Sequence, residues 1–198
     1  VFQITGAAPA VIAKRRFGIP FVTTYGFWYG RLAGSRASGV LRRVVETLGL
    51  RPADAVIVTT PELGAHVAGR VGAAKVHLIP NGVDTHAFAP ASRPVAAPVI
   101  GCTGRLHRKN GHPTLLDAFA AIRQAVPEAR LLLVGDGRER GSLERAVSRL
   151  GWGGAVTFAG EQADVRPWLH RMAVYVQPSI SEGMSNSILE AMASGLPV

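Results

Sequence analysis

The sequence predicts an α/β fold made of two Rossmann-like domains with parallel sheets, facing each other across a cleft and each incomplete. Short β-branched runs alternate with amphipathic helical segments, as is typical of βα units. Residues 80–98 contain four prolines and no hydrophobic periodicity, which indicates a linker between two such domains. The 198 residues are 47% hydrophobic, which is enough apolar material to fill their cores.

The half before the linker contains the elements of one parallel sheet. We predict strands at residues 2–5, 21–24, 55–59 and 75–79, and helices at residues 9–17, 38–48 and 61–71. The third helix has the clearest start, because Thr60 can cap it and Pro61 suits its first position.

The half after the linker repeats the alternation. We predict strands at residues 99–103, 131–134, 155–158 and 174–177, and helices at residues 112–126, 138–150, 164–171 and 185–193. Residues 1–92 are therefore interpreted as the C-terminal portion of an N-terminal domain plus linker, and residues 93–198 as the N-terminal portion of a C-terminal domain. The chain starts at Val1 and ends where another strand would begin, so we expect a segment truncated at both ends.

Composition excludes several classes of protein. The one cysteine, Cys102, cannot form an intramolecular disulfide or a cysteine-based zinc site, and a reduced cytoplasmic protein fits best. The 23 glycines and 13 prolines are scattered, which excludes collagen-like and low-complexity chains. No apolar run approaches the roughly 18 residues of a membrane span, and no targeting pattern is visible.

Positive charge is concentrated in the first half. Residues 1–98 carry 11 basic and four acidic residues, whereas residues 99–198 carry 11 and nine. This imbalance favours an anionic partner such as a phosphorylated ligand, an acidic lipid surface or nucleic acid, although solvated basic faces would look the same. The clusters at residues 14–16 and 42–43 lack the interleaved aromatic residues of a single-strand nucleic-acid groove.

One loop has the residues for a diphosphate site. Ligands of open α/β sheets bind at the carboxyl ends of the strands, and residues 104–111 follow such an end. There Arg105 and Lys109 lie beside a predicted helix start, where a guanidinium can bind phosphate oxygens twice and an ammonium adds a point charge. A solvated basic loop is the alternative, and the spacing of a Walker loop is absent.

Two other strand ends give weaker signals. Gly135, Asp136 and Gly137 form a tight strand-to-helix turn that we interpret as structural, because the further glycine spacing of a dinucleotide site is missing. At Gly160 and Glu161, small residues would let a flat ring approach the backbone.

The last loop carries the most chemistry. Glu182 precedes a predicted helix and Glu190 lies inside it, with backbone N–H groups of residues 183–187 between them. A loop carboxylate with helix-start amides can hold sugar hydroxyls and phosphate, and a carboxylate one turn into the helix can accept two hydrogen bonds from a ribose diol. Alternatively, Ser187 and Glu190 have the spacing of a capping box, in which Glu190 would only bond the cap backbone.

With these residues in view, the chain resembles the retaining glycosyltransferases of family 4, which have the GT-B fold. The matching segments, in order, are 79–84 (Ile-Pro-Asn-Gly-Val-Asp), 104–106 (Gly-Arg-Leu), 115–119 (Leu-Leu-Asp-Ala-Phe), 133–137 (Leu-Val-Gly-Asp-Gly), 156–160 (Val-Thr-Phe-Ala-Gly), 178–179 (Pro-Ser), the pair Glu182 and Glu190, and 191–193 (Ala-Met-Ala). The family transfers a sugar, with retention of configuration and without a metal ion, from a nucleotide diphosphate sugar.

The resemblance implies catalytic roles for three residues. Arg105 and Lys109 would neutralise the departing diphosphate, which is work that a metal ion does elsewhere. The lysine of the family falls at Asn110 here, so Lys109 would replace it after a slight shift of the loop. Glu182 would contact the donor sugar while the glycosidic bond breaks.

The resemblance also implies a set of donor-binding residues. Glu190 would bind the ribose hydroxyls, and Gly160 and Glu161 would lie against the base. Backbone amides would meet the sugar and phosphate, and they belong to Gly183, Met184, Ser185 and Asn186. No metal and no cofactor are expected beyond a UDP- or GDP-linked sugar, and the truncated segment alone is expected to be inactive.

The acceptor would be bound mostly by the first half, and a glycan, a lipid-linked molecule or a small molecule would each fit. We expect a role in cell-envelope polysaccharide synthesis, in the cytoplasm or at the inner face of an anionic membrane, and no nucleic-acid partner. Three alternatives remain: a catalytically inactive relative, another GT-B enzyme such as a non-hydrolysing epimerase, and a basic nucleic-acid-binding module. The last would show steeply salt-dependent binding and would leave Glu182 and Glu190 unexplained.

Overall fold

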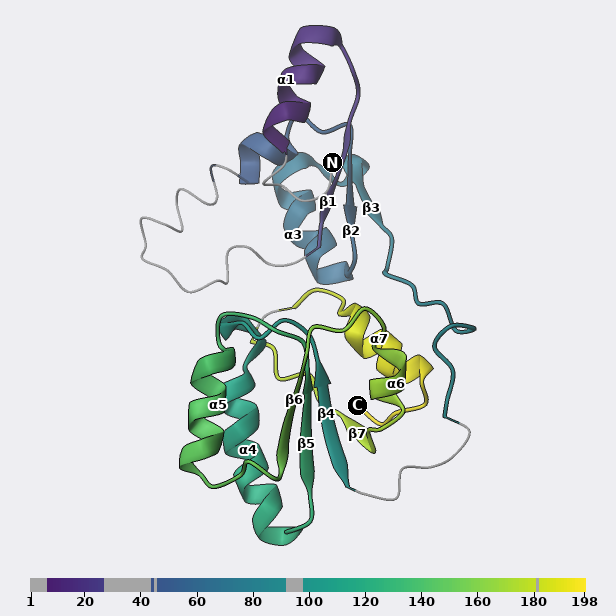
Figure 1. Ribbon diagram of the computed structural model, residues 1–198. Helices are drawn as coiled ribbons and strands as arrows, with labels where there is room; N and C mark the ends of the chain where they lie inside the picture. Colours follow the sequence, from purple (N-terminus) through teal and green to yellow (C-terminus); the bar gives the residue numbers. More distant parts are fainter. Residues whose placement is uncertain (1–6, 27–43, 45, 92–97, 181) are drawn as a thin grey trace. The chain divides into compact units, whose positions relative to one another are not determined.

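The structure, a computed structural model, describes residues 7–26, 44, 46–91, 98–180 and 182–198. The chain divides into two compact units, Val1–Asn81 with Ser181–Met184 and Gly82–Ile180 with Ser185–Val198. Each unit contains one sheet in which all pairings are parallel (Figure 1). The predicted α/β class with two parallel sheets is therefore confirmed. How the two units correspond to an acceptor and a donor domain stays a prediction.

The first unit has a three-stranded sheet in the order β1-β2-β3. Its elements are α1 (Ala7–Phe17), β1 (Val22–Tyr25), β2 (Ala55–Val58), α3 (Pro61–Val71), the 3₁₀ helix η3 (Ala73–Lys75) and β3 (Val76–Leu78). These match the predicted elements to within two residues at each end. The predicted strand at 2–5 and most of the predicted helix at 38–48 lie outside the described residues, although residues 46–50 are helical.

Helix α3 forms where the sequence predicts it. The Thr60 side chain accepts a hydrogen bond of 3.3 Å from the backbone N–H of Leu63, and Pro61 occupies the first helical position. Leu63 and Val67 are buried on one face of the helix, in the same apolar cluster as Val58 of β2. Capping and burial of this face thus act together to fix α3 on the sheet.

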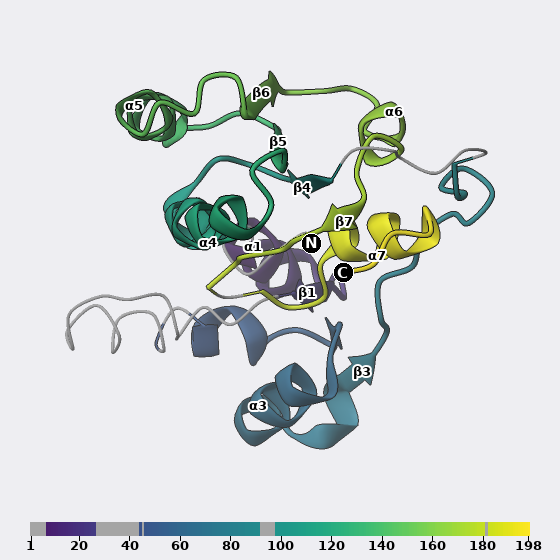
Figure 2. The same cartoon turned by 90° about the horizontal axis from the view of Figure 1, so that it is seen from below.

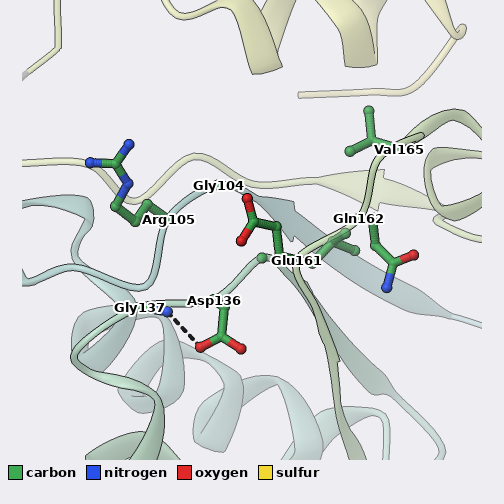
Figure 3. A pocket seen from close by; sticks show the side chains of 9 residues that line it. Gly104, Arg105, Asp136, Gly137, Glu161, Gln162 and Val165 are labelled. Atoms are coloured by element: carbon green, nitrogen blue, oxygen red, sulfur yellow. Dashed lines mark hydrogen bonds between the residues drawn. The ribbon is translucent and has the colours of Figure 1, made fainter.

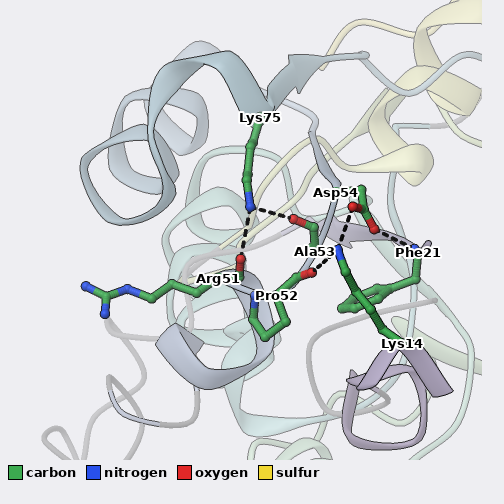
Figure 4. Close-up of polar contacts among 7 residues, drawn as sticks. All are labelled: Lys14, Phe21, Arg51, Pro52, Ala53, Asp54 and Lys75. Carbon is green, nitrogen blue, oxygen red and sulfur yellow. Dashed lines mark hydrogen bonds and ion pairs between the residues drawn. The ribbon is translucent and has the colours of Figure 1, made fainter. Parts of the chain in front are cut away.

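Two lysines of the basic first half are used inside the unit (Figure 4). The Lys14 ammonium donates to the Pro52 carbonyl at 2.9 Å and to the Asp54 carboxylate at 2.5 Å. The Lys75 ammonium donates to the carbonyls of Arg51 and Ala53 at 3.1 and 3.0 Å. Both lysines therefore hold the loop that enters β2, so part of the positive charge is structural.

The second unit has a four-stranded sheet in the order β6-β5-β4-β7. Its elements are β4 (Val99–Thr103), the 3₁₀ helix η4 (Arg108–Asn110), α4 (His112–Ala125), β5 (Arg130–Val134), α5 (Arg140–Arg149), β6 (Val156–Gly160), α6 (Arg166–Leu169), β7 (Val174–Tyr175) and α7 (Asn186–Ala193). Every strand and α-helix predicted after the linker is present, with ends shifted by up to two residues.

Apolar residues cover both faces of this sheet, as a parallel sheet requires. Leu131 and Leu133 of β5 face the cluster that contains α4 and α5, whereas Leu132 and Val134 face the cluster that contains α6 and α7. Figures 1 and 2 accordingly show α4 and α5 on one face of the sheet and α6 and α7 on the other.

The strand order creates a switch point between β4 and β7. The chain moves from β4 outward to β5 and β6, then returns to the other edge of β4 to form β7. Loops that leave the carboxyl ends of two such strands diverge, and ligands of open α/β sheets bind in the crevice between them. Residues 104–111 and 176–180 are the two segments concerned here.

Thr23, in the middle of β1, is fully buried, and no described residue bonds its hydroxyl oxygen. We expect Thr23→Val to raise the free energy of unfolding by about 1 kcal/mol, because it removes an unsatisfied buried hydroxyl at constant shape. Urea unfolding followed by tryptophan fluorescence measures this. Thr103→Val, which removes a bonded hydroxyl in β4, should instead lose about 1 kcal/mol. A loss of stability in Thr23→Val would contradict the prediction.

Candidate functional site

A cavity of about 480 Å³ lies at the carboxyl ends of β4, β5 and β6. It is lined by Gly104, Arg105, Val134, Gly135, Asp136, Gly137, Glu161, Gln162 and Val165. Figure 3 shows the side chains of Arg105, Asp136 and Glu161 projecting from three different loops around it. The structure thus brings two predicted site residues, Arg105 and Glu161, to one cavity at the edge where ligands of parallel sheets bind.

Backbone hydrogen bonds build the floor of the cavity. The Gly104 N–H donates to the Val134 carbonyl at 2.8 Å, and the Leu106 N–H donates to the Asp136 carbonyl at 2.9 Å. A Cβ at Gly135 would lie 2.1 Å from the Gly104 carbonyl oxygen, and Gly135 has a φ of +135°. Only glycine fits this close approach. The structural role predicted for the 135–137 turn therefore accounts for the glycine at position 135.

The same turn also contributes a charged side chain to the cavity. The Asp136 carboxylate accepts hydrogen bonds from the Gly137 N–H at 2.7 Å and from the Arg140 guanidinium at 2.6 Å. The Arg140 hydrogen bond and then the Gly137 N–H hold the pKa of Asp136 below its ordinary value. Asp136 therefore remains ionised, and its charge is matched by Arg140 on the following helix.

Sequence reasoning missed Asp136, Gln162 and Val165 as lining residues. For Asp136 the signal was available, because an acidic residue directly after a buried strand lies at the ligand-binding edge of a parallel sheet. Gln162 and Val165 follow β6 without any pattern, and the Gln162 amide donates to the Ala159 carbonyl at 2.7 Å. Only the folded loop brings these two side chains to the cavity.

The predicted diphosphate loop is fixed from within by Asn110. Asn110 is buried, and its amide donates to the Arg105 carbonyl at 2.7 Å across the loop. The Arg105 side chain is exposed at the cavity, whereas Lys109 lies in η4, is half-buried and is not a lining residue. The position where the family carries a lysine therefore has a structural role in this chain.

Helix α7 begins at Asn186, and its N-cap is Ser185. The Ser185 hydroxyl accepts a hydrogen bond of 3.5 Å from the Ile188 N–H, so Ser187 already lies inside the helix. The capping-box interpretation of Ser187 and Glu190 is consequently wrong, because Ser187 is not at the cap. Residues 185–187 supply the N-terminal amides of α7, and groups of this kind can bind an anion.

Glu190 is a half-buried carboxylate in the middle of α7. Burial raises its pKa above that of an ordinary glutamate. Within the described part of the chain, no hydrogen bond or ion pair to this carboxylate occurs. Such a group is available to accept hydrogen bonds from a ligand, and a ligand donor would offset the cost of its burial.

Three predicted residues pack in the first unit: Glu182, Gly183 and Met184. The Asn81 amide donates to the Met184 carbonyl at 2.8 Å. A Cβ at Gly183 would lie 1.9 Å from the Gly26 carbonyl oxygen, so this position also requires glycine. The other predicted site residues belong to the second unit, and these are Arg105, Lys109, Gly160, Glu161, Ser185, Asn186 and Glu190.

The described residues were also searched for two other kinds of feature. None of their helices combines the length and the apolar character that a bilayer crossing needs. Among residues 7–26, 44, 46–91, 98–180 and 182–198, no three His, Cys, Asp or Glu side chains gather closely enough to hold a metal ion.

Curated bacterial proteins resemble this chain over most of its length. The lipopolysaccharide core biosynthesis glycosyltransferase LpsE of Rhizobium meliloti is 35% identical over 75% of the chain and 44% of its own length. A GDP-mannose-dependent alpha-(1-6)-phosphatidylinositol monomannoside mannosyltransferase of Mycolicibacterium smegmatis is 31% identical over 86% of the chain and 50% of its own length. The chain thus spans about half the length of these relatives.

Solved structures share the fold at lower identity. Anabaena Alr3699/HepE, in complex with UDP and glucose, matches 100% of this chain and 57% of its own with a TM-score of 0.84 and 24% identity. S. aureus TarM matches 98% of this chain and 39% of its own with a TM-score of 0.83 and 16% identity. These likenesses support the GT-B fold that the resemblance implied.

Two family models cover the chain on either side of the linker. Residues 1–82 match the glycosyl transferase 4-like domain, and residues 97–198 match glycosyl transferases group 1. The boundary between the two matches falls in the proline-rich stretch that interrupts the βα alternation. With both units matched in the order that the fold requires, the chain belongs to the group 1 glycosyltransferases of GT-B fold.

Proposed function

We propose that the protein transfers a hexose from a nucleotide diphosphate sugar to an acceptor, with retention of configuration and without a metal ion. The observation that carries the proposal is the cavity at the carboxyl ends of β4, β5 and β6, which the exposed Arg105 side chain lines. Membership of a glycosyltransferase family gives this cavity its substrate class. A nucleoside diphosphate has a size that suits it, and Arg105 supplies a cation for the phosphates.

Charge neutralisation is the proposed work of Arg105 and Lys109. When the glycosidic bond breaks, negative charge grows on the leaving diphosphate, and preorganised cations stabilise it more strongly in the transition state than in the bound substrate. Asn110 supports this role indirectly, because its bond to the Arg105 carbonyl fixes the loop from which the guanidinium projects. Glu182 is proposed to contact the donor sugar during this step.

The remaining groups are proposed to hold the nucleotide. The Glu190 carboxylate would accept hydrogen bonds from the ribose diol, and Gly160 and Glu161 would lie along the base. The N–H groups of residues 183–186 would bind the sugar and the phosphate. UDP and GDP are the candidate carriers, since HepE was crystallised with UDP and the mycobacterial relative is named for GDP-mannose.

A cell-envelope glycan or a lipid-linked molecule is the proposed acceptor. The rhizobial relative is named for lipopolysaccharide core biosynthesis, and the mycobacterial relative for a phosphatidylinositol mannoside. Acceptor binding by the first unit would agree with its excess of basic residues. Two of these residues, Lys14 and Lys75, already donate hydrogen bonds within the unit.

Nucleotide binding provides the first test. A nucleoside diphosphate at 100 times its dissociation constant should stabilise the folded protein by about 2.7 kcal/mol. We expect UDP or GDP, but not ADP, to raise the melting temperature, with or without EDTA. Glu190→Ala should lose this stabilisation, whereas Glu128→Ala, which changes an exposed glutamate near the amino end of β5, should keep it. A folded protein that responds to no nucleotide would overturn the proposal.

The raised pKa of Glu190 predicts a pH dependence. The folded state keeps this proton to higher pH than the unfolded chain, so its stabilising effect is present below the ordinary pKa of 4.5 and is lost as pH rises through the raised value. Glu190→Gln removes the titration. Urea unfolding should therefore show the variant gaining stability relative to the wild type as the pH rises above the ordinary glutamate pKa of 4.5. If the variant instead loses stability relative to the wild type as the pH rises, a raised pKa of Glu190 is contradicted.

Saturating nucleotide should have the opposite effect on how the stability of the wild type changes with pH. Ribose hydroxyls donate hydrogen bonds, so the bound nucleotide favours the ionised Glu190 carboxylate. The stabilisation that UDP or GDP confers on the wild type should therefore grow over the same pH range, and it should not do so in Glu190→Gln.

We also propose peripheral contact with an anionic membrane through the end of α1. Arg15 and Arg16 are exposed there beside Ile12 and Phe17, whose exposed fractions are 65% and 71%. Two cations with two exposed apolar side chains suit the boundary between anionic headgroups and acyl chains.

Vesicle sedimentation tests this contact. The protein should pellet with phosphatidylglycerol vesicles and not with phosphatidylcholine vesicles. Arg15→Gln with Arg16→Gln should weaken binding about 30-fold, from about 1 kcal/mol per arginine. The matched pair Arg145→Gln with Arg149→Gln removes the same charge from an exposed face of α5 and should have little effect. Equal losses from both pairs would indicate only a dependence on net charge.

A further inference from the structure

The Tyr175 hydroxyl lies at the switch point of the second sheet. Tyr175 is the last residue of β7, and Thr103 is the last residue of β4, the strand with which β7 pairs. The Tyr175 side chain has no exposed surface, and its hydroxyl lies 3.2 Å from both the hydroxyl and the carbonyl oxygen of Thr103. Arg105 follows Thr103 by two residues, so this contact reaches the base of the proposed diphosphate loop.

The same hydroxyl also reaches the loop that leads to α7. It donates to the Gln177 side-chain oxygen at 2.7 Å, and the Gln177 amide donates to the Ser179 hydroxyl at 2.7 Å. The Ser187 side chain, in the first turn of α7, bonds the same tyrosine hydroxyl. One buried oxygen therefore connects β4, the 177–179 loop and the helix that carries Glu190.

The chemistry of these groups fixes the direction of the chain of hydrogen bonds. Because the Gln177 amide nitrogen donates to Ser179, its oxygen faces Tyr175 and can only accept. The Tyr175 proton then points to Gln177, and its oxygen accepts from the Thr103 and Ser187 hydroxyls. Burial raises the pKa of Tyr175 to about 12, so this proton is always present.

Two backbone contacts tie the same loops together. The Ile180 N–H donates to the Lys109 carbonyl at 2.9 Å. A Cβ at Gly111 would lie 2.0 Å from the Pro178 carbonyl oxygen, and Gly111 has a φ of +69°. The loop after β4 and the loop after β7 are thus packed as one body, with a polar centre at Tyr175.

We propose that Tyr175 is a positioning residue for the donor site: its hydroxyl holds the Arg105 loop and the α7 loop in the mutual register that one bridging nucleoside diphosphate requires. This inference rests on the proposed function. A ligand that spans both loops benefits from their preorganisation, whereas a ligand that touches only one loop does not. Tyr175 itself need not contact the nucleotide.

The test compares a ligand that bridges the two loops with the nucleoside alone, which does not. For Tyr175→Phe, calorimetry should show the affinity for GDP or UDP, whichever the wild type binds, reduced by about tenfold, because the loops are no longer preorganised. The affinity for the matching nucleoside, which is proposed to contact α7 but not the Arg105 loop, should change by less than about twofold. Thr103→Val, which removes a donor to the same oxygen, should reproduce this pattern in weaker form.

Tyr25→Phe is the matched control. Tyr25 is also a fully buried tyrosine, and its hydroxyl bonds the buried Glu46 in the first unit. The variant Tyr25→Phe should therefore lose a comparable amount of folding stability without weakening nucleotide binding. Unchanged GDP or UDP affinity in Tyr175→Phe, or equal losses for the nucleoside diphosphate and the nucleoside, would overturn the positioning role.

Hydrogen exchange of the ligand-free protein separates this inference from the proposed function. In Tyr175→Phe the amides of residues 104–111 and those of residues 177–180 and 185–190 should exchange about tenfold faster together, and in Tyr25→Phe they should not. Joint acceleration in a protein that binds no nucleotide would overturn the proposed function and leave the loop coupling intact. Acceleration of only one segment would overturn the coupling.

Discussion

Parallel pairing of β4 along both of its edges is the interaction on which the second unit depends. Pairing with β5 and with β7 turns the first strand after the linker into the centre of the sheet. The carboxyl ends of β4, β5 and β6 then surround one cavity, while the loops after β4 and β7 pack against each other. Side chains that are separated by more than 50 residues in the sequence, such as Arg105 and Glu161, meet for this reason.

Close backbone approach is the second requirement of the site, and glycine provides it. Gly111, Gly135 and Gly137 each lie where a Cβ would contact a carbonyl oxygen of a neighbouring loop at 2.0 to 2.3 Å. The loops can therefore pack directly against one another and need no side chains between them. The site therefore depends on glycine positions that contribute no functional group of their own.

The fold was largely predictable because its signals are local. Hydrophobic periodicity located the strands and helices, and the Thr60 cap was recognised from two residues. The site was harder, because its geometry depends on contacts between loops. Ser185 rather than Ser187 caps α7 because the helix begins at Asn186, before the start that a cap at Ser187 would require, and Asn110 acquires its role only through its bond to the Arg105 carbonyl. The Tyr175 hydroxyl carried no sequence signal, because aromatic residues in buried strands usually serve as core.

The central strand also carries the only sulfhydryl of the 198 residues. Cys102 lies in β4 with 3% of its surface exposed, and burial raises its pKa to about 12. A thiol in this state is almost free of thiolate and closed to reagents, so it reacts only when β4 separates from its neighbours. The rate of alkylation thus measures how often the strand β4 opens, and it does so without any introduced label.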